Sequence, residues 1–415
     1  MSGMHPLPRR DFASLANDSL SGESGAVAAI ALRLHQAFEN HMLSGRESAV
    51  SELPPAGVHT GPVPGARISR QEAESLYHEA GLHTLGALAR HAREALYPGG
   101  IVSYVADRNI NYSNICVCGC RFCAFFRPPG HAEGYVISRE ELDRKIRETI
   151  ALGGTQILMQ GGHHPDLPLS WYEELIAWIR EQHPSIHIHS FSPPEIVFFA
   201  NKEGIGVSEV IARLIRAGLH SIPGGGAEIL SDRVRRLVSP NKCDAAQWLG
   251  VMEEAHAQGL KTTATMMFGH LEEDGERLDH LFAVRAAQDR SGGYTAFIPW
   301  TFQSANTAID CPPETAQGYL RVLALSRLVL DNVPSIQASW VTMGPQIAQL
   351  ALFFGANDFG SLMIEENVVA AAGVRFHMSR EEIHAVIAGA GFTPRQRLMD
   401  YTLLHAADNP GSGRS

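Results

Sequence analysis

The central part of the chain alternates short, continuously apolar runs with longer stretches in which apolar residues recur at helical spacing. The runs at 154–162 and 260–270 each contain three consecutive apolar residues, at 157–159 and 266–268, in place of strict polar–apolar alternation. Such runs are typical of strands that are buried on both faces of a parallel sheet. Stretches such as 208–218 place apolar residues three or four positions apart, which favours amphipathic helices. The pattern therefore predicts a series of strand–helix units.

Eight such units can be counted over roughly 270 residues. The predicted strands lie at 109–115, 154–162, 185–191, 219–226, 260–270, 294–300, 335–341 and 357–361. No sequence repeat accompanies them, which excludes a solenoid. Eight strand–helix units predict the α/β class and, within it, a (β/α)8 TIM-like barrel or an open variant of one.

The two ends of the chain differ from this pattern. Residues 1–65 are predicted to be a variable, partly disordered extension with one apolar helical stretch at 26–43. A capping box formed by Ser69 and Glu72 opens the next helix. We expect residues 66–405 to form the barrel with its flanking helices and residues 406–415 to form a tail.

Polar residues and glycines gather directly after the predicted strands. Because the carboxyl ends of barrel strands carry the active site, we expect these residues to share one mouth with the loop after the first strand. They are Gly161, Gly162, His163, Ser190, Ser192, Glu195, Glu228, His270, Gln303, Glu365 and Glu366.

Composition and charge narrow the classes of function. The net charge is −10 and no basic run stands out, so nucleic-acid binding is not expected. No apolar run is long enough to span a membrane, and the first residues lack the apolar core of a signal peptide. We expect a cytoplasmic protein in a reducing compartment, where clustered cysteines indicate metal binding or catalysis rather than disulfides.

Four of the six cysteines lie between residues 114 and 127, and Cys116, Cys120 and Cys123 have the spacing C-x3-C-x2-C. Structural zinc would need a closed set of four ligands, and a redox C-x-x-C pair would leave Cys116 without a role. Clustered thiolates favour an iron–sulfur cluster, in which three ligands would leave one iron open. Zinc and chance remain alternatives at this point. Cys118 falls outside the spacing and is interpreted as a spectator thiol.

The cysteine spacing, with the aromatic Phe122 before the last cysteine, resembles the signature of the radical S-adenosylmethionine superfamily. The resemblance implies that the three cysteines hold a [4Fe–4S] cluster whose open iron binds S-adenosylmethionine. One electron then cleaves that cofactor to a 5′-deoxyadenosyl radical, which abstracts a hydrogen atom. The turn at 161–165 lies where the superfamily has a Gly-Gly-Glu-type turn, but His163 replaces the glutamate. The S-adenosylmethionine contacts that the resemblance implies are Phe122, Gly161, Gly162, His163 and Ser190.

The resemblance covers about residues 67–405 and extends to one lineage of the superfamily. That lineage contains dehypoxanthine futalosine cyclase, aminofutalosine synthase and the larger component of deazaflavin (FO) synthase. The turns around 221–230, 263–270 and 295–303 are most similar to the cyclase of the futalosine route to menaquinone. The cyclase resemblance implies hydrogen abstraction from the ribose of dehypoxanthine futalosine and addition of the carbon radical to the benzoate ring.

The resemblance also implies partners and further site residues. A donor such as flavodoxin or ferredoxin would supply the electron. If loss of the ring proton needs a base, Glu195, Glu228 and His270 are the candidates from their places after strands. Two readings of other classes remain: an iron–sulfur electron-transfer protein and a zinc-stabilised barrel of unrelated activity.

Overall fold

The computed structural model describes residues 22–48 and 61–404. Seven strands form one parallel sheet whose spatial order follows the order of the chain. These strands are β2 (Asp107–Asn111), β3 (Gln156–Gln160), β4 (His187–Ser190), β5 (Ser221–Ile222), β6 (Lys261–Phe268), β7 (Tyr294–Thr301) and β8 (Ser335–Ile336). Each predicted strand from 154–162 to 335–341 therefore contains one strand of this sheet.

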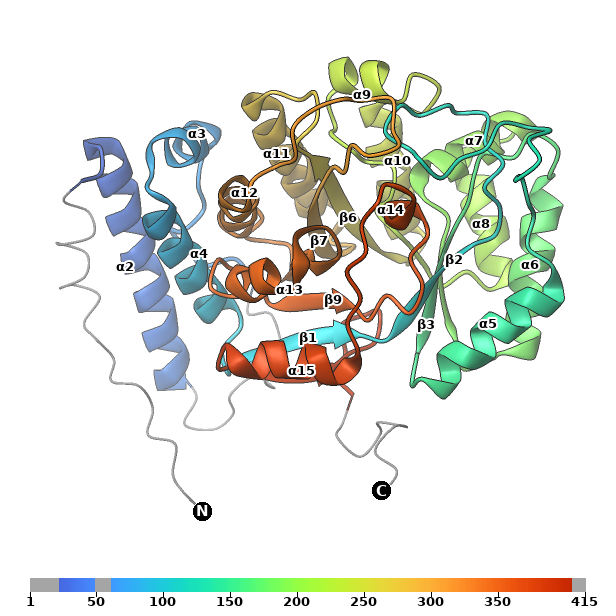
Figure 1. The fold of residues 1–415 in the computed structure, drawn as a ribbon. Helices are drawn as coiled ribbons and strands as arrows, with labels where there is room; N and C mark the ends of the chain where they lie inside the picture. Colours follow the sequence, from blue (N-terminus) through green and yellow to red (C-terminus); the bar gives the residue numbers. More distant parts are fainter. Residues whose placement is uncertain (1–21, 49–60, 405–415) are drawn as a thin grey trace.

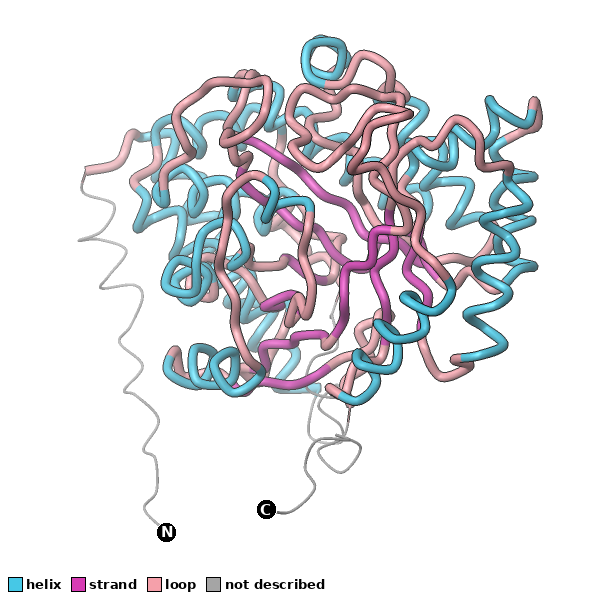
Figure 2. The backbone as a smooth tube through the Cα atoms, turned by 45° about the vertical axis from the view of Figure 1, so that its right-hand side comes forward, coloured by secondary structure: helices cyan, strands magenta, loops and turns pink. Residues whose placement is uncertain are grey.

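An eighth strand position closes the sheet into a ring. β9 (Asp358–Ser361) is joined to the end of β8 by a parallel bridge between Gln337 and Asp358. β9 also pairs in parallel with β1 (Ile101–Val105), which runs through Ala106 directly into β2. The strands therefore surround one core, as Figure 2 shows, and the predicted (β/α)8 barrel is confirmed.

Helices connect successive strands and cover the outside of the ring (Figure 1). They include α5 (Arg139–Ala151), α6 (Leu169–Gln182), α7 (Pro193–Glu203), α8 (Val207–Ala217), α9 (Asp232–Val238), α10 (Ala245–Ala257), α11 (Asp274–Ser291), α12 (Ala316–Val329), α13 (Trp340–Ala351), α14 (Val368–Ala371) and α15 (Arg380–Gly389). Side-chain caps begin several of them: Ser138 accepts a hydrogen bond from the Glu141 backbone, and Asp244 accepts one from Gln247. Among the described helices, none is long and apolar enough to cross a membrane.

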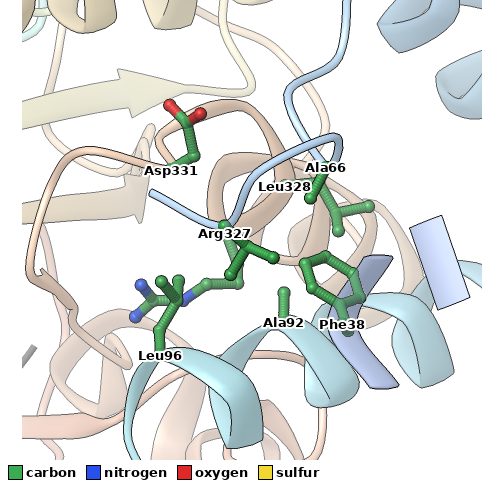
Figure 3. A pocket seen from close by; sticks show the side chains of 8 residues that line it. Phe38, Ala66, Ala92, Leu96, Arg327, Leu328 and Asp331 are labelled. Atoms are coloured by element: carbon green, nitrogen blue, oxygen red, sulfur yellow. The ribbon is translucent and has the colours of Figure 1, made fainter. Parts of the chain in front are cut away.

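Three helices before the barrel form a layer on one side of it (Figure 1). These are α2 (Gly25–Ser48), α3 (Arg70–Glu79) and α4 (Leu82–Leu96), and α4 packs against α12. α2 buries Val27, Leu34 and Phe38 against this layer. The helix predicted at 26–43 is therefore present and packs on the body of the protein. Figure 3 shows a pocket at this contact, lined by Phe38 together with residues of α4 and α12.

The start of the barrel differs from the sequence-based expectation. The first strand was predicted at 109–115, but β2 ends at Asn111 and the preceding strand β1 was not predicted. β10 (Thr393–Gln396), which pairs with β1 outside the main sheet, was also missed. Four of the five residues of β2 are polar and only Ile110 is apolar, yet all five are buried. The polar ones find partners inside: Gln156 donates to Asp107 at 2.6 Å, and Asn109 donates to Glu366 at 2.7 Å.

Candidate active site

The cysteine loop leaves the carboxyl end of β2 and is held in shape by backbone hydrogen bonds. The Cys116 N–H donates to the Arg127 carbonyl at 2.9 Å, and the Arg127 N–H donates to the Asn114 carbonyl at 2.8 Å. The tip is tied to the end of α9, since the Arg121 N–H donates to the Val238 carbonyl at 2.8 Å. All six cysteines are free thiols. The loop therefore presents its thiols from a fixed backbone at the mouth of the barrel.

Local donors favour the thiolate form of two of these cysteines. The Cys116 Sγ accepts the backbone N–H groups of Cys118 at 3.4 Å and of His163 at 3.3 Å. A hydrogen bond from the Cys118 thiol, with these N–H groups, lowers the pKa of Cys116 to about 6. The same thiol lowers the pKa of Cys120, whereas burial raises the pKa of Cys123. Thiolates are the form in which cysteine binds metal.

The placement of the cysteines suits an iron–sulfur cluster better than a single ion. Among the described residues, the cysteines form no group of three side chains close enough together to hold one metal ion. Three ligands of a cubane bind three different irons and are spaced more widely. The structure therefore gives no support to a single-ion zinc site at these cysteines, and the prediction that Cys116, Cys120 and Cys123 hold a [4Fe–4S] cluster stands as a prediction.

The two glycines of the turn after β3 allow that turn to pack against the cysteine loop. A Cβ at Gly161 would lie 2.3 Å from the Tyr112 ring, and a Cβ at Gly162 would lie 2.1 Å from the Ile115 carbonyl oxygen. The Gly162 N–H also donates to the Ser113 carbonyl at 2.9 Å. Only residues without a Cβ permit this approach, so both glycines are required by the contact between turn and loop.

His163, at which the chain departs from the superfamily pattern, contacts Cys118, which falls outside the cysteine motif. The Cys118 Sγ lies 2.9 Å from the His163 Nδ1, and both side chains are buried. The His163 ring stacks on Phe198 with 4.7 Å between centroids. Burial, with a smaller contribution from Lys242, lowers the pKa of His163 to about 3, so the imidazole is neutral. The thiol interpreted as a spectator thus has a defined partner in the turn.

Glu195 supports the same turn from beneath. Its carboxylate accepts hydrogen bonds from the Tyr112 hydroxyl at 2.6 Å, from the Gly161 N–H at 3.2 Å, and from the N–H and hydroxyl of Ser192. Burial raises its pKa despite these donors. All of these partners belong to the protein, so Glu195 positions the turn and the start of α7. Ser190, also fully buried, donates to the Met159 carbonyl at 2.7 Å.

Glu228 lies beside the cysteine loop and is paired with two cations. Its Oε1 is 2.9 Å from the Lys242 Nζ, and its Oε2 is 3.5 Å from an Arg235 nitrogen. The Lys242 ammonium lies 5.0 Å from the centroid of the Phe122 ring, which connects this pair to the loop. Glu228 adopts a φ of 40°, which is unusual for a residue with a side chain. Lys242 therefore contacts both the Glu228 carboxylate and the Phe122 ring of the cysteine loop.

His270, the third candidate base, has both ring nitrogens engaged within its own segment. Nε2 lies 3.1 Å from the Met267 carbonyl oxygen, and Nδ1 accepts the Leu271 N–H at 2.7 Å. The side chain is fully buried, and burial lowers its pKa. In this conformation the imidazole shapes the turn after β6, and it has no free nitrogen for a ligand.

Sequence reasoning missed three residues of this site: Tyr112, Arg235 and Lys242. Tyr112 connects the loop to Glu195, and Arg235 donates to the carbonyls of Gly226 and Ala227. Lys242 is a single lysine between α9 and α10, where no spacing or motif marks it. Their roles come from contacts between segments far apart in the chain.

Comparisons with known proteins agree with this geometry. Residues 110–284 match the model of the Radical SAM superfamily, and residues 291–409 match the CofH/MqnC C-terminal region. Cyclic dehypoxanthine futalosine synthase of Halalkalibacterium halodurans is 45% identical over 84% of this chain and 94% of that protein. The protein of the same name from Streptomyces coelicolor is 43% identical over 84% of this chain and 88% of that protein.

Two further proteins are similar to this chain, one in sequence and one in fold. A 5-amino-6-(D-ribitylamino)uracil--L-tyrosine 4-hydroxyphenyl transferase of Methanosarcina barkeri is 40% identical over 76% of this chain and 86% of that protein. The crystal structure of methylornithine synthase has the same fold, with a TM-score of 0.62 at 16% identity over 79% of this chain and 94% of that one. Members of the superfamily are enzymes that use a [4Fe–4S] cluster and S-adenosylmethionine. With its three-cysteine loop, its glycine turn and these relatives, the chain belongs to the radical SAM superfamily, among the proteins with a CofH/MqnC C-terminal region.

Proposed function

We propose that this enzyme is a cyclic dehypoxanthine futalosine synthase acting in menaquinone biosynthesis. The observation that carries the proposal is the match to two proteins of that name, at 45% and 43% identity over most of each. The archaeal tyrosine transferases match at 36–40%, over 74–82% of this chain. The same site could serve either reaction, so the identity of the substrate is the question that an assay must decide.

The proposed reaction closes a ring within one substrate molecule. The [4Fe–4S] cluster and S-adenosylmethionine, when bound and reduced by one electron, supply methionine and a 5′-deoxyadenosyl radical. A hydrogen atom passes from the ribose of dehypoxanthine futalosine to the deoxyadenosyl carbon. The ribose carbon then bonds to the benzoate ring. The resulting ring radical would return one electron to the oxidised cluster and give one proton to a base, which restores aromaticity. The product has two hydrogens fewer than the substrate.

The residues of the chain contribute mainly positioning and the exclusion of water. Cys116, Cys120 and Cys123 would hold the cluster, and the turn at Gly161 and Gly162 would face the cofactor with its backbone. A radical that must react with a neighbouring carbon needs both carbons held at near-attack distance. The stiff contact between turn and loop suits that requirement.

Among the candidate bases, we assign acceptance of the ring proton to Glu228. Glu195 and His270 have their polar atoms engaged by the protein in this conformation, which favours positioning roles for them. Glu228 is paired with Lys242 and Arg235, but each carboxylate oxygen keeps a lone pair that can accept a proton, and Glu228 is the candidate that lies beside the cysteine loop. This role predicts that Glu228→Gln slows product formation more than hydrogen abstraction.

The test uses anaerobically reconstituted enzyme with S-adenosylmethionine, a flavodoxin or ferredoxin reducing system, and dehypoxanthine futalosine. Mass spectrometry should find 5′-deoxyadenosine and a product lighter by two hydrogens, and deuterium on the reacting ribose carbon should enter 5′-deoxyadenosine. Parallel reactions contain tyrosine with the ribitylaminouracil, or an enolpyruvyl-oxybenzoate for aminofutalosine synthase. Turnover of either of these, with dehypoxanthine futalosine unchanged, would overturn the assignment while leaving the superfamily intact.

A further inference from the structure

A cluster of metal-ligating side chains lies outside the barrel, between α2 and α4. His35 and Glu39 are four residues apart on α2 and so lie on one face of that helix. His91 faces them from α4. One ligand atom from each of the three lies within 4.8 Å of the other two, and no other described group of three histidines, cysteines or carboxylates does so.

The distances within the cluster suit coordination by one ion. The Nδ1 atoms of His35 and His91 are 3.1 Å apart. The Glu39 carboxylate contacts the other ring nitrogen of His91, Nε2, at 3.1 Å, so binding to the same ion needs rotation of the half-buried Glu39 side chain. Ligands bound at about 2.0–2.1 Å around a tetrahedral zinc ion are separated by roughly 3.3 Å. The two imidazole nitrogens already have nearly this separation, so an ion could replace the proton between them without movement of either helix.

The surroundings restrict which ion would bind. His91 is buried beside Phe38, whose ring centroid lies 5.5 Å away, while His35 and Glu39 are half-buried at the edge. Two imidazoles and a carboxylate suit zinc, and a water molecule can enter from the open edge as the fourth ligand. Oxygen-preferring ions such as magnesium or calcium would find only one carboxylate.

From this geometry we propose that His35, Glu39 and His91 form a zinc site that cross-links α2 to α4. The site is far in the fold from the cysteine loop: its residues belong to the helical layer, and the cysteines lie at the carboxyl end of β2. A zinc ion at this site would cross-link α2 to α4 and so hold the N-terminal helix against the rest of the protein. Because binding requires both helices to be in place, zinc stabilises the folded state.

Equilibrium dialysis of the cluster-loaded enzyme against zinc at pH 7.5, followed by metal analysis, measures the binding. Wild type should retain one zinc per chain that His35→Ala and Glu39→Gln lose, with affinity at least about tenfold weaker. His83→Ala, which removes an exposed histidine of the same helix α4, is the matched control and should bind as wild type does. His35 and Glu39 are half-buried, so these variants decide the question even if His91→Ala fails to fold.

X-ray absorption at the zinc edge separates this site from the cysteines. Nitrogen and oxygen ligands at about 2.0–2.1 Å, without a sulfur shell near 2.3 Å, are expected. Zinc should also raise the thermal midpoint of wild type and His83→Ala but not that of His35→Ala. Equal zinc binding by His35→Ala and His83→Ala, a sulfur shell, or no retained zinc would overturn the proposal and leave a hydrogen-bonded triad.

Discussion

Replacing Gly162 by alanine tests the close contact between the turn and the cysteine loop. The added Cβ would lie 2.1 Å from the Ile115 carbonyl oxygen and 2.8 Å from the Cys116 Cβ. Both neighbours belong to the loop backbone or sit directly on it, so no flexible side-chain end can move aside. Relief of the overlap needs a relative shift of about 1 Å between turn and loop, because carbon–oxygen contacts are rarely shorter than about 3 Å.

The substitution is expected to lower both the stability of the fold and the rate of S-adenosylmethionine cleavage. Overpacking of a tight contact typically costs ~1–3 kcal/mol, which a protein of this size can survive. A displacement of about 1 Å at a reacting centre can cost roughly 10²-fold in rate. We therefore expect Gly162→Ala to fold, to bind the cluster less completely, and to lose about two orders of magnitude in S-adenosylmethionine cleavage.

Iron content, the visible absorption of the reconstituted cluster and the rate of 5′-deoxyadenosine formation measure these effects. Gly250→Ala is the matched control, since Gly250 lies exposed within α10 and its added Cβ meets no atom within 4 Å. That variant should gain up to ~1 kcal/mol in stability and keep full activity. Wild-type cleavage and iron content in Gly162→Ala would refute the close contact as described.

Three further predictions follow from the structure. Cys123→Ala should lose the [4Fe–4S] absorption, whereas Cys118→Ala should keep its iron content; the reverse result would show that the ligands are assigned wrongly. Leu34→Ala, at a fully buried position of α2, should lower the free energy of unfolding by ~2–5 kcal/mol, against little change for Leu32→Ala, which is 53% exposed. A hydrogen bond from an arginine lowers the pKa of Glu276 to about 2, below its unfolded value, so its stabilising effect is present above about pH 4.5 and is lost as the pH falls toward 2. Glu276→Gln should accordingly flatten the acid limb of a thermal-midpoint profile measured from pH 7 to pH 3, and an unchanged limb would contradict this pairing.

The barrel could be predicted from the sequence where burial matched residue type. β7 is apolar along most of its length and β6 ends in three consecutive apolar residues, and both are mostly buried, as strands of a parallel sheet are expected to be. β2 was placed too late in the chain because it carries Asp107, Asn109 and Asn111 in a fully buried strand. A polar residue is buried only where a partner from another segment satisfies it, and such partners are invisible in a local pattern.

The residues of the candidate site also form two groups: those that the sequence predicted, and those that only the fold brought together. The sequence by itself predicted the three cysteines as cluster ligands and marked the glycine turn, because ligand spacing on one loop and the absence of a Cβ are local properties. Only the tertiary structure decided that Cys118 meets His163, that Lys242 joins Glu228 to the cysteine loop, and that the helix of the N-terminal extension packs on α4. These contacts join segments far apart in the chain. They form because closure of the barrel and burial of the helical layer bring those segments together. The local pattern of apolar and polar residues cannot predict such long-range contacts.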